Sequence, residues 1–363
     1  MGGQLPEDLG GDGVAEVLDL CLSCKACKTE CPSNVDMARL KSEVMQLRFD
    51  RKGMPLGERF IGMSADVARR LAGPLAPLVN AVQRSAPFRY VLERVAGFDR
   101  RRVLPSYTRR PFRAAEPIEV APSGKKVVLF ADTWTQCHDS HLGRAAARVL
   151  QRLGYDVEVV AAGCCQRPRI SHGHLRQAVA HGSRTVERLR PWLEAGVPVL
   201  VLEPSCASAF TDDLADLLPD EALAQKLKTG VHFLDAWLAD ALRRGEVRPP
   251  WKTDEPAGRI LVHGHCHQKA LWSTADTVTL LQALPGAEVT EIPSGCCGMA
   301  GSFGYEKGHY ELSRKIAEAA LLPAIRKEPE ATVVAPGFSC RHQIADFAGR
   351  QARHWVEVWD GYL

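Results

Sequence analysis

The 363-residue sequence predicts a helical, cysteine-bearing segment followed by two similar α/β domains, each built on a parallel sheet. Three observations support this class. Four cysteines crowd into a short N-terminal run, eight more recur in two sets of four, and β-branched runs alternate with helical patterns beyond residue 124. Alternating strands and helices are typical of a parallel sheet. We expect four parts, residues 1–53, 54–122, 123–252 and 253–363.

The first part contains the run CLSCKACKTECP, which has the CxxCxxCxxxCP spacing of bacterial ferredoxins. One tight loop can present three thiolates to a 4Fe-4S cluster, while the cysteine before the proline turns away from that loop. Such runs normally occur in pairs, and this sequence holds one copy. A zinc knuckle would usually show two CxxC pairs with a longer spacer. The run therefore predicts half of an α-helical ferredoxin domain, with cluster ligands Cys21, Cys24, Cys27 and Cys31.

The residues around this run are basic and helical. Lys25 and Lys28 either favour a reduced, more negative cluster or are ordinary solvated side chains. Apolar spacing predicts a helix after the loop, with Asn34 as its cap and Gly53 as its stop. Residues 54–122 read as a helical, basic linker. Its arginine-rich end, FDRRRVLPSYTRRPFRAAEP, is expected to lie along the protein's own acidic surface.

The remaining chain contains an internal duplication of cysteines. Offsets of 129, 132 and 134 residues relate the two sets, and each set includes a vicinal pair. Each cysteine or pair follows a buried strand pattern: KKVVLFAD, YDVEVVAAG and VPVLVLEPS, then RILVHGH, AEVTEIPSG and ATVVAPGFS. The cysteines should therefore gather at the carboxyl edges of two sheets, where ligands bind in open α/β folds. The two sets are Cys137, Cys164, Cys165 and Cys206, and Cys266, Cys296, Cys297 and Cys340.

These eight cysteines are candidate metal ligands. Each set could hold a second cluster, hold zinc, or form a redox-active dithiol. Inert packing is disfavoured because the glycines of GCCGMAG let the backbone approach a bound group closely. The neighbouring histidines His138, His265 and His267 could act as ligands or proton relays, and we favour a hydrogen-bonding role beside the site for them.

The motifs GCCGMAGSFGYE and HGHCHQKAL, together with LDLCLSCKACKTECPSNVD, resemble those of a known group of proteins. They are similar to the cysteine-rich CCG domains of the iron–sulfur subunits of glycolate oxidase, anaerobic glycerol-3-phosphate dehydrogenase and heterodisulfide reductase. They look closer still to the C-terminal iron–sulfur region of FAD-linked D-2-hydroxy-acid dehydrogenases. The resemblance implies that a first cluster motif and an FAD domain lie upstream or on a partner subunit. Cys31 would then ligate the neighbouring cluster.

One departure from that pattern limits the resemblance. In the heterodisulfide reductase type, each repeat ends in CxxC and binds a non-cubane cluster. Here Cys206 is followed by ASA and Cys340 by RHQ, so each repeat is one thiolate short. Heterodisulfide reduction is therefore not expected of this chain.

The resemblance implies an electron-transfer module of a flavin-dependent 2-hydroxy-acid dehydrogenase of the lactate, glycolate or 2-hydroxyglutarate type. It would relay electrons from FAD on a missing or partner segment to a quinone or other acceptor. The alternatives are a thiol or disulfide reductase at a CCG site and a zinc-stabilised scaffold. A formal net charge of +3 gives no reason to expect nucleic acid as a partner. Without a long apolar stretch or leader pattern, we expect a cytoplasmic protein, at most peripheral to a membrane.

Overall fold

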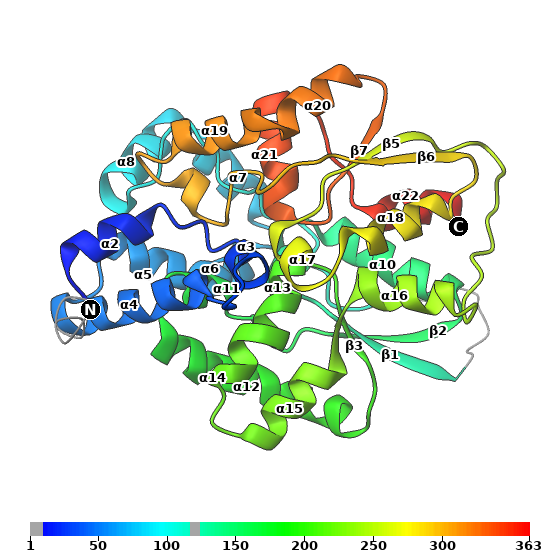
Figure 1. Ribbon diagram of the computed structural model, residues 1–363, viewed down its shortest axis with the longest axis horizontal. Helices are drawn as coiled ribbons and strands as arrows, with labels where there is room; N and C mark the ends of the chain where they lie inside the picture. Colours follow the sequence, from blue (N-terminus) through cyan, green and yellow to red (C-terminus); the bar gives the residue numbers. More distant parts are fainter. Residues whose placement is uncertain (1–9, 117–123) are drawn as a thin grey trace.

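The computed structural model of the protein describes residues 10–116 and 124–363. Its N-terminal region is helical, as predicted, and lies beside the two sheets (Figure 1). The loop with the first four cysteines runs between α2 and α4. The helices of this region are α2 (Asp12–Asp19), α3 (Ala26–Glu30), α4 (Met37–Lys52), α5 (Leu56–Gly62), α6 (Ser64–Leu71), α7 (Ala76–Arg84) and α8 (Ala86–Ala96).

Helix α4 begins at Met37 because Asp36 caps it. The Asp36 carboxylate accepts hydrogen bonds from the backbone N–H groups of Ala38 and Arg39, at 3.0 and 3.1 Å. The prediction of Asn34 as the cap is wrong. Asn34 has a left-handed backbone conformation (φ 52°) and lies in the turn after the cysteine run. The predicted stop at Gly53 is confirmed: this C-cap glycine adopts a φ of 79°.

The first sheet has the strand order β2-β1-β3-β4, with all pairs parallel. Its strands are β1 (Lys125–Phe130), β2 (Tyr155–Val160), β3 (Val199–Val201) and β4 (Val231–Phe233). The first three were predicted, whereas β4 was not. The helical elements are α9 (Thr133–Cys137), α10 (Ser140–Arg152), α11 (Arg167–Ser171), α12 (Leu175–Glu194), α13 (Pro204–Ser208), π-helical η1 (Ala209–Leu214), α14 (Ala215–Leu217), α15 (Glu221–Gly230) and α16 (Leu234–Arg243).

The second sheet has the parallel order β6-β5-β7. Both sheets therefore reverse their strand order beside their first strand, which opens a crevice at the carboxyl edge. The strands are β5 (Gly258–Val262), β6 (Ala287–Glu291) and β7 (Thr332–Val334). The helical elements are α17 (Cys266–Leu271), α18 (Thr274–Gln282), the 3₁₀ turn η2 (Phe303–Tyr305), α19 (Tyr310–Ala319), α20 (Leu321–Lys327), α21 (Phe338–Ala348) and α22 (Trp355–Tyr362).

The two sheets share one hydrophobic core. Helices α10 and α16 from the first sheet pack against α22 and α18 from the second (Figure 1). Leu142, Leu238, Leu280, Trp355 and Trp359 all belong to this buried cluster. Because the core spans both sheets, their carboxyl edges are held in a fixed relation to each other.

The arginine-rich segment after α8 lies along the second sheet's domain. The backbone N–H of Asp99 donates to the Tyr305 carbonyl at 2.6 Å, and Phe98 forms an antiparallel bridge with Glu306. This segment thus follows its own protein's surface. The predicted boundary at residue 122 lies outside the described residues.

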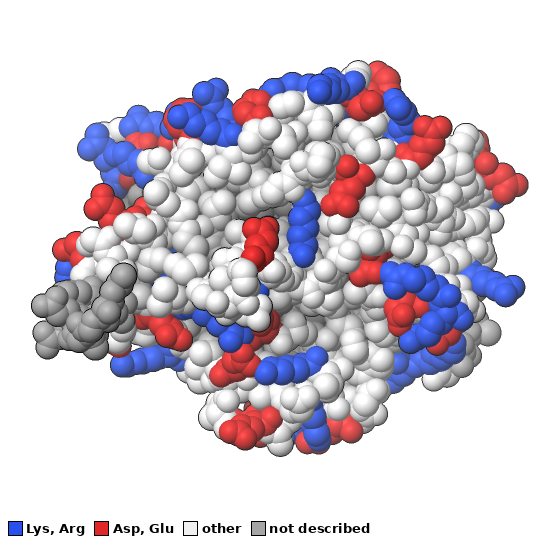
Figure 2. Space-filling model, viewed as in Figure 1, with Lys and Arg blue, Asp and Glu red and all other residues white. Residues whose placement is uncertain are grey.

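The surface mixes both signs of charge. On the face shown in Figure 2, lysine, arginine and carboxylate side chains alternate around the margin, while the middle of the face is mostly uncharged. Within residues 10–116 and 124–363, no helix is both long and apolar enough to cross a membrane.

Candidate iron–sulfur and metal site

The N-terminal cysteine loop is shaped by two unusual backbone conformations. Ser23 and Lys25, which flank Cys24, both have positive φ angles of 51° and 63°. Left-handed residues next to ordinary ones turn successive backbone N–H groups toward one point and form an anion-binding concavity. The first residue of α4 adds a donor, since the backbone N–H of Met37 donates to the Cys27 thiol at 3.3 Å. The loop is therefore suited to thiolate ligands.

The structure brings together the first three cysteines of the run. Burial raises the pKa of Cys24, and the neighbouring thiols of Cys266, Cys21 and Cys27 raise it further. A thiol whose pKa is raised by neighbouring thiols favours a bound cation, which removes the repulsion between thiolates. Cys24 thus lies close to Cys266, in the second sheet's domain, as well as to its neighbours in the loop.

Cys31 has a different environment. Backbone N–H groups of Val35 and Ser33 point at its sulfur and lower its pKa. The thiol of Cys31 lies at the end of the short helix α3, while Cys24 faces the second sheet's domain.

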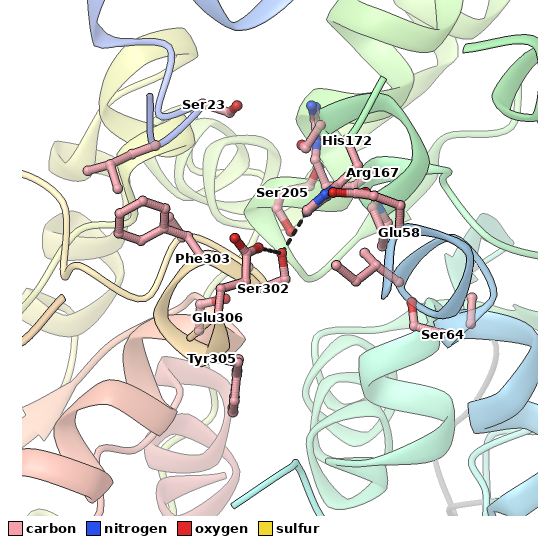
Figure 3. A pocket seen from close by; sticks show the side chains of 18 of the residues that line it. Ser23, Glu58, Ser64, Arg167, His172, Ser205, Ser302, Phe303, Tyr305 and Glu306 are labelled. Atoms are coloured by element: carbon pink, nitrogen blue, oxygen red, sulfur yellow. Dashed lines mark hydrogen bonds and ion pairs between the residues drawn. The ribbon is translucent and has the colours of Figure 1, made fainter. Parts of the chain in front are cut away.

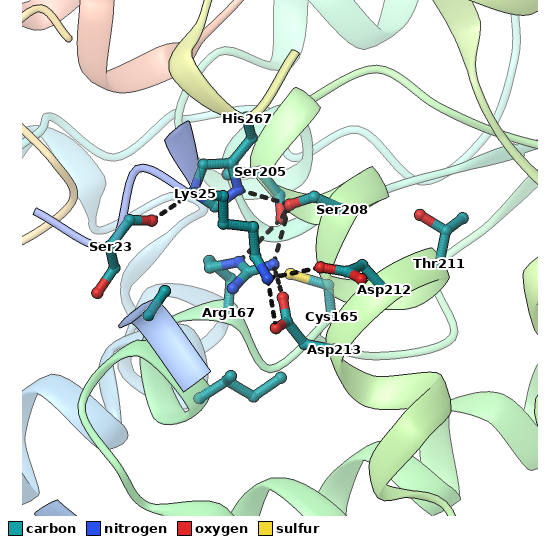
Figure 4. Close-up of polar contacts among 12 residues, drawn as sticks. Ser23, Lys25, Cys165, Arg167, Ser205, Ser208, Thr211, Asp212, Asp213 and His267 are labelled. Atoms are coloured by element: carbon teal, nitrogen blue, oxygen red, sulfur yellow. Dashed lines mark hydrogen bonds and ion pairs between the residues drawn. The ribbon is translucent and has the colours of Figure 1, made fainter. Parts of the chain in front are cut away.

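Lys25 anchors the loop to the first sheet's domain and is not solvated. Its side chain is fully buried, and its ammonium group donates to Asp212 at 2.6 Å, Asp213 at 2.7 Å and Asp36 at 3.2 Å (Figure 4). Burial would raise the pKa of Asp213, but Arg167 and Lys25 outweigh burial and lower it. These ion pairs hold the cysteine loop against η1.

His267 joins the loop to both sheets. Its Nε2 lies 2.9 Å from the Ser23 carbonyl, and its Nδ1 lies 2.6 Å from the Ser208 hydroxyl (Figure 4). Burial lowers the pKa of His267 well below its usual value, so the ring is neutral. A carbonyl only accepts hydrogen bonds, so Nε2 carries the proton and Nδ1 accepts from Ser208. His265 caps α17 instead, accepting from the backbone N–H of His267.

In the first sheet's set, the Cys165 and Cys206 sulfurs lie 3.0 Å apart. The Cys164 thiol accepts from the backbone N–H of Gln166 at 3.3 Å, and Gln166 has a positive φ of 69°. Burial raises the pKa of both Cys137 and Cys206 to about 12. Without a cation, all these thiols stay protonated.

The second set has the same local geometry with a histidine added. The Cys296 thiol accepts from the backbone N–H of Gly298 at 3.4 Å. A ring nitrogen of His263 and the sulfurs of Cys297 and Cys340 lie within 4.8 Å of one another. All three residues are buried.

A cavity of about 580 Å³ connects the N-terminal loop with both sets. Its wall is largely apolar and aromatic, and cysteines of all three groups reach it. The residues that line the cavity include Cys21, Cys165, Cys206, Cys266, Trp134 and Tyr107.

A chain of hydrogen bonds runs along the rim of this cavity (Figure 3). The Ser302 hydroxyl donates to Glu306 at 2.8 Å and lies 2.6 Å from Nε2 of His172. Nδ1 of His172 lies 3.0 Å from Glu58. Burial would raise the pKa of Glu58, but hydrogen bonds from His172 and His174 outweigh it and hold the pKa at about 2. Such a chain can carry protons to a molecule in the cavity.

Comparison with known proteins places these features in context. The family model of the cysteine-rich CCG domain matches residues 260–345. Residues 260–345 form a CCG domain. The resemblance expected from the motifs is thus confirmed.

The similar proteins carry related names. The chain is 27% identical to a subunit of the anaerobic glycerol-3-phosphate dehydrogenase of Escherichia coli, over 84% of this chain and 76% of that protein. It is 26% identical to the E. coli glycolate oxidase iron-sulfur subunit, over 94% and 81%. It is 28% identical to D-2-hydroxyglutarate dehydrogenase of Pseudomonas putida, over 93% of this chain but only 33% of that protein. The chain therefore spans about a third of such dehydrogenases.

Sequence reasoning missed several residues of the site. Ser302 and Glu306 flank η2 and both lie in the motif GCCGMAGSFGYE, but Glu58 lies on α5 and His172 directly follows α11, so no local motif joins all four. His263 was missed as well, although a signal was present: it is the first residue of HGHCHQKAL and lies in the predicted strand pattern RILVHGH.

Proposed function

We propose that this chain is an iron–sulfur electron-transfer module of a flavin-dependent dehydrogenase. Cys21, Cys24 and Cys27 would hold a 4Fe-4S cluster, which when bound takes up and releases one electron at a time. The donor set fits such a group: three thiols on one loop, with backbone N–H groups directed at the sulfurs of Cys24 and Cys27. Cys31 would ligate a neighbouring cluster outside this chain.

The names of the similar proteins support this proposal. They include iron–sulfur and other subunits of dehydrogenases, and longer D-2-hydroxyglutarate dehydrogenases. We infer that FAD and the oxidation of a 2-hydroxy acid lie on a partner or on a segment outside this chain. The electron acceptor would be a quinone or another flat, apolar molecule.

The observation that carries the proposal is the contact between the cysteine loop and the second set. Cys24 and Cys266 interact electrostatically, and Cys21 and Cys266 line the same cavity. Electrons arriving at the loop would thus reach the cavity over a short distance. The apolar wall would accept a quinone ring, and the chain from Glu306 to Glu58 would supply the protons that its reduction consumes.

The test is to purify the full chain without oxygen and quantify iron and acid-labile sulfide, with low-temperature EPR of the reduced protein. We expect about four iron per chain and a cubane signal. Cys24→Ser should abolish the signal. Cys31→Ser, the matched control in the same run, should keep it. Zinc in place of iron, or an unchanged signal in Cys24→Ser, would refute the proposal and favour a zinc scaffold.

A second candidate function, a thiol or disulfide reductase, is favoured by the pair Cys165 and Cys206. Sulfurs 3.0 Å apart need little movement to reach the roughly 2.05 Å of a disulfide bond. Forming that bond releases two electrons and two protons, which a disulfide substrate would take up as two thiols. Alkylation and peptide mapping of the same anaerobic sample distinguish the two functions. Reversible loss of two free thiols at these positions, without iron, would favour the reductase.

A further inference from the structure

His263 is a buried histidine whose Nε2 atom has no hydrogen-bond partner among the described residues. It directly follows β5, and its backbone N–H donates to the Val334 carbonyl of β7 at 2.9 Å, which fixes its position between the two strands. The residue is 0% exposed. A buried polar atom without a partner is costly and calls for an explanation.

The other ring nitrogen shows why Nε2 is bare. Nδ1 of His263 lies 2.8 Å from the Ser294 hydroxyl. That hydroxyl lies 3.4 Å from the Ile292 carbonyl, which can only accept a hydrogen bond. Ser294 can thus donate to Ile292 and accept from Nδ1–H of His263. This arrangement leaves the Nε2 lone pair free, as in histidines that bind metals through Nε2.

The His263 ring lies next to two buried thiols. One of its nitrogens and the sulfurs of Cys297 and Cys340 lie within 4.8 Å of one another. A tetrahedral zinc ion, with bonds of about 2.0 to 2.3 Å, spaces its ligands about 3.5 to 3.8 Å apart. A small inward movement of these three atoms would therefore complete three of four ligand positions. Cys266 and Cys296 lie beside them, since the charges of both raise the pKa of Cys340.

The first sheet's set lacks this nitrogen. The residue three positions before Cys266 is His263, whereas the residue three positions before Cys137 is Trp134. The indole of Trp134 stacks on Phe338 with ring centroids 4.2 Å apart, so it serves packing. The two repeats are therefore chemically unequal despite their matching cysteines.

We propose that the second α/β domain binds a single metal ion of the zinc type through His263, Cys297 and Cys340, with the fourth position facing Cys266 and Cys296. The imidazole supplies the ligand that a CxxC ending would have supplied, because Cys340 is followed by Arg341, His342 and Gln343. The first set has no such nitrogen ligand. This assignment does not depend on a cluster in the N-terminal loop.

The test titrates the full chain, without oxygen, with Co²⁺, whose visible d–d bands and sulfur-to-metal charge-transfer band report tetrahedral thiolate sites. We expect His263→Ala to bind one equivalent fewer than the unmodified protein, or to bind that equivalent at least about 100-fold more weakly. Iron and sulfide in the N-terminal loop should be unchanged. The Co²⁺ titration therefore tests the proposed metal site, and the iron and sulfide content separately tests the proposed cluster.

Two further variants keep the test decisive. His263→Cys restores a ligand and should regain the lost equivalent with a stronger charge-transfer band. His354→Ala is the matched control, because His354 is also buried with an unpartnered Nε2 among the described residues, and its Co²⁺ stoichiometry should not change. Unchanged stoichiometry and d–d bands in His263→Ala would overturn the proposal. If His263→Ala fails to fold, a charge-transfer band in His263→Cys no stronger than in the unmodified protein would overturn it.

Discussion

Lys25 shows how one side chain can set the position of a whole cysteine loop. It is fully buried, and its ammonium group contacts three carboxylates, two of them on η1 at the far side of the site. Removing one partner of a buried ion pair leaves the other charges without compensation, which costs far more than losing a surface pair. Lys25 and Lys28 both contact Asp212, but Lys28 is 30% exposed.

Lys25→Met should therefore lower the free energy of unfolding by about 3 to 5 kcal/mol. Lys28→Met, in the same loop and with the same partner, should lower it by no more than about 1 kcal/mol. Urea unfolding of the three proteins measures the difference. Equal losses in the two variants would mean that the buried carboxylates do not depend on Lys25.

For single residues, the sequence shows which side chains are candidate ligands, but it does not show which distant residues a side chain contacts. The cysteines could be picked out because ligand spacing is a local pattern. The role of Lys25 could not, because its main partners, Asp212 and Asp213, lie 187 and 188 residues away along the chain. The chain from Glu58 to Glu306 likewise depends on elements that only folding brings together.

Among the elements, the segment after α8 depends on Arg102. This arginine is 4% exposed, and its guanidinium donates to the Gly304 carbonyl, Asp346 and Ser313 at 2.7 to 2.9 Å. It thereby ties the segment to η2, α19 and α21. Arg100, two residues earlier, pairs with Glu93 near the surface.

Arg102→Leu should release this segment, because four hydrogen bonds of one planar group are lost and Asp346 loses its ion-pair partner. We expect faster amide exchange for residues 98–104 in hydrogen–deuterium exchange mass spectrometry. Arg100→Leu should leave most of this protection in place. Protection in Arg102→Leu equal to that of the unmodified protein would show that backbone pairing alone holds the segment.

The regular elements were largely predictable, and their ends were less so. Apolar β-branched runs mark β1, β3, β5 and β7, whose residues are mostly buried because parallel strands are covered on both faces. The edge strands β2 and β6 were also predicted as buried, but most of their residues are only partly buried or exposed. The cap of α4 was misplaced by two residues because both Asn34 and Asp36 can cap a helix. Only the backbone turn after the cysteine run decides between them.

For the whole molecule, the decisive feature is that both sheets share a core. Asp235 on α16 lies at the centre of this shared region. Its carboxylate accepts from Thr277 of α18 at 2.5 Å and from Trp355 of α22 at 2.7 Å. These contacts join a helix of the first sheet to two helices of the second. Complete burial raises the pKa of Asp235 to about 7 despite these hydrogen bonds.

This pKa predicts a pH-dependent stability. A carboxyl group whose pKa is higher in the folded than in the unfolded protein binds its proton more tightly when folded, so stability falls as pH rises. The loss begins near the unfolded pKa of about 4 and is complete above about 7. Between pH 5 and pH 8, Asp235 should reduce the free energy of unfolding by about 2 to 3 kcal/mol.

Asp235→Asn removes the titrating group and keeps its size, so this variant should gain about 2 to 3 kcal/mol relative to the unmodified protein between pH 5 and pH 8. Asp240→Asn is the matched control, because Asp240 lies on the same helix with a half-exposed side chain. Urea unfolding at both pH values measures the change. A constant difference between Asp235→Asn and the unmodified protein would show that the carboxylate between the two sheets stays ionised, so that the shared core tolerates a buried negative charge.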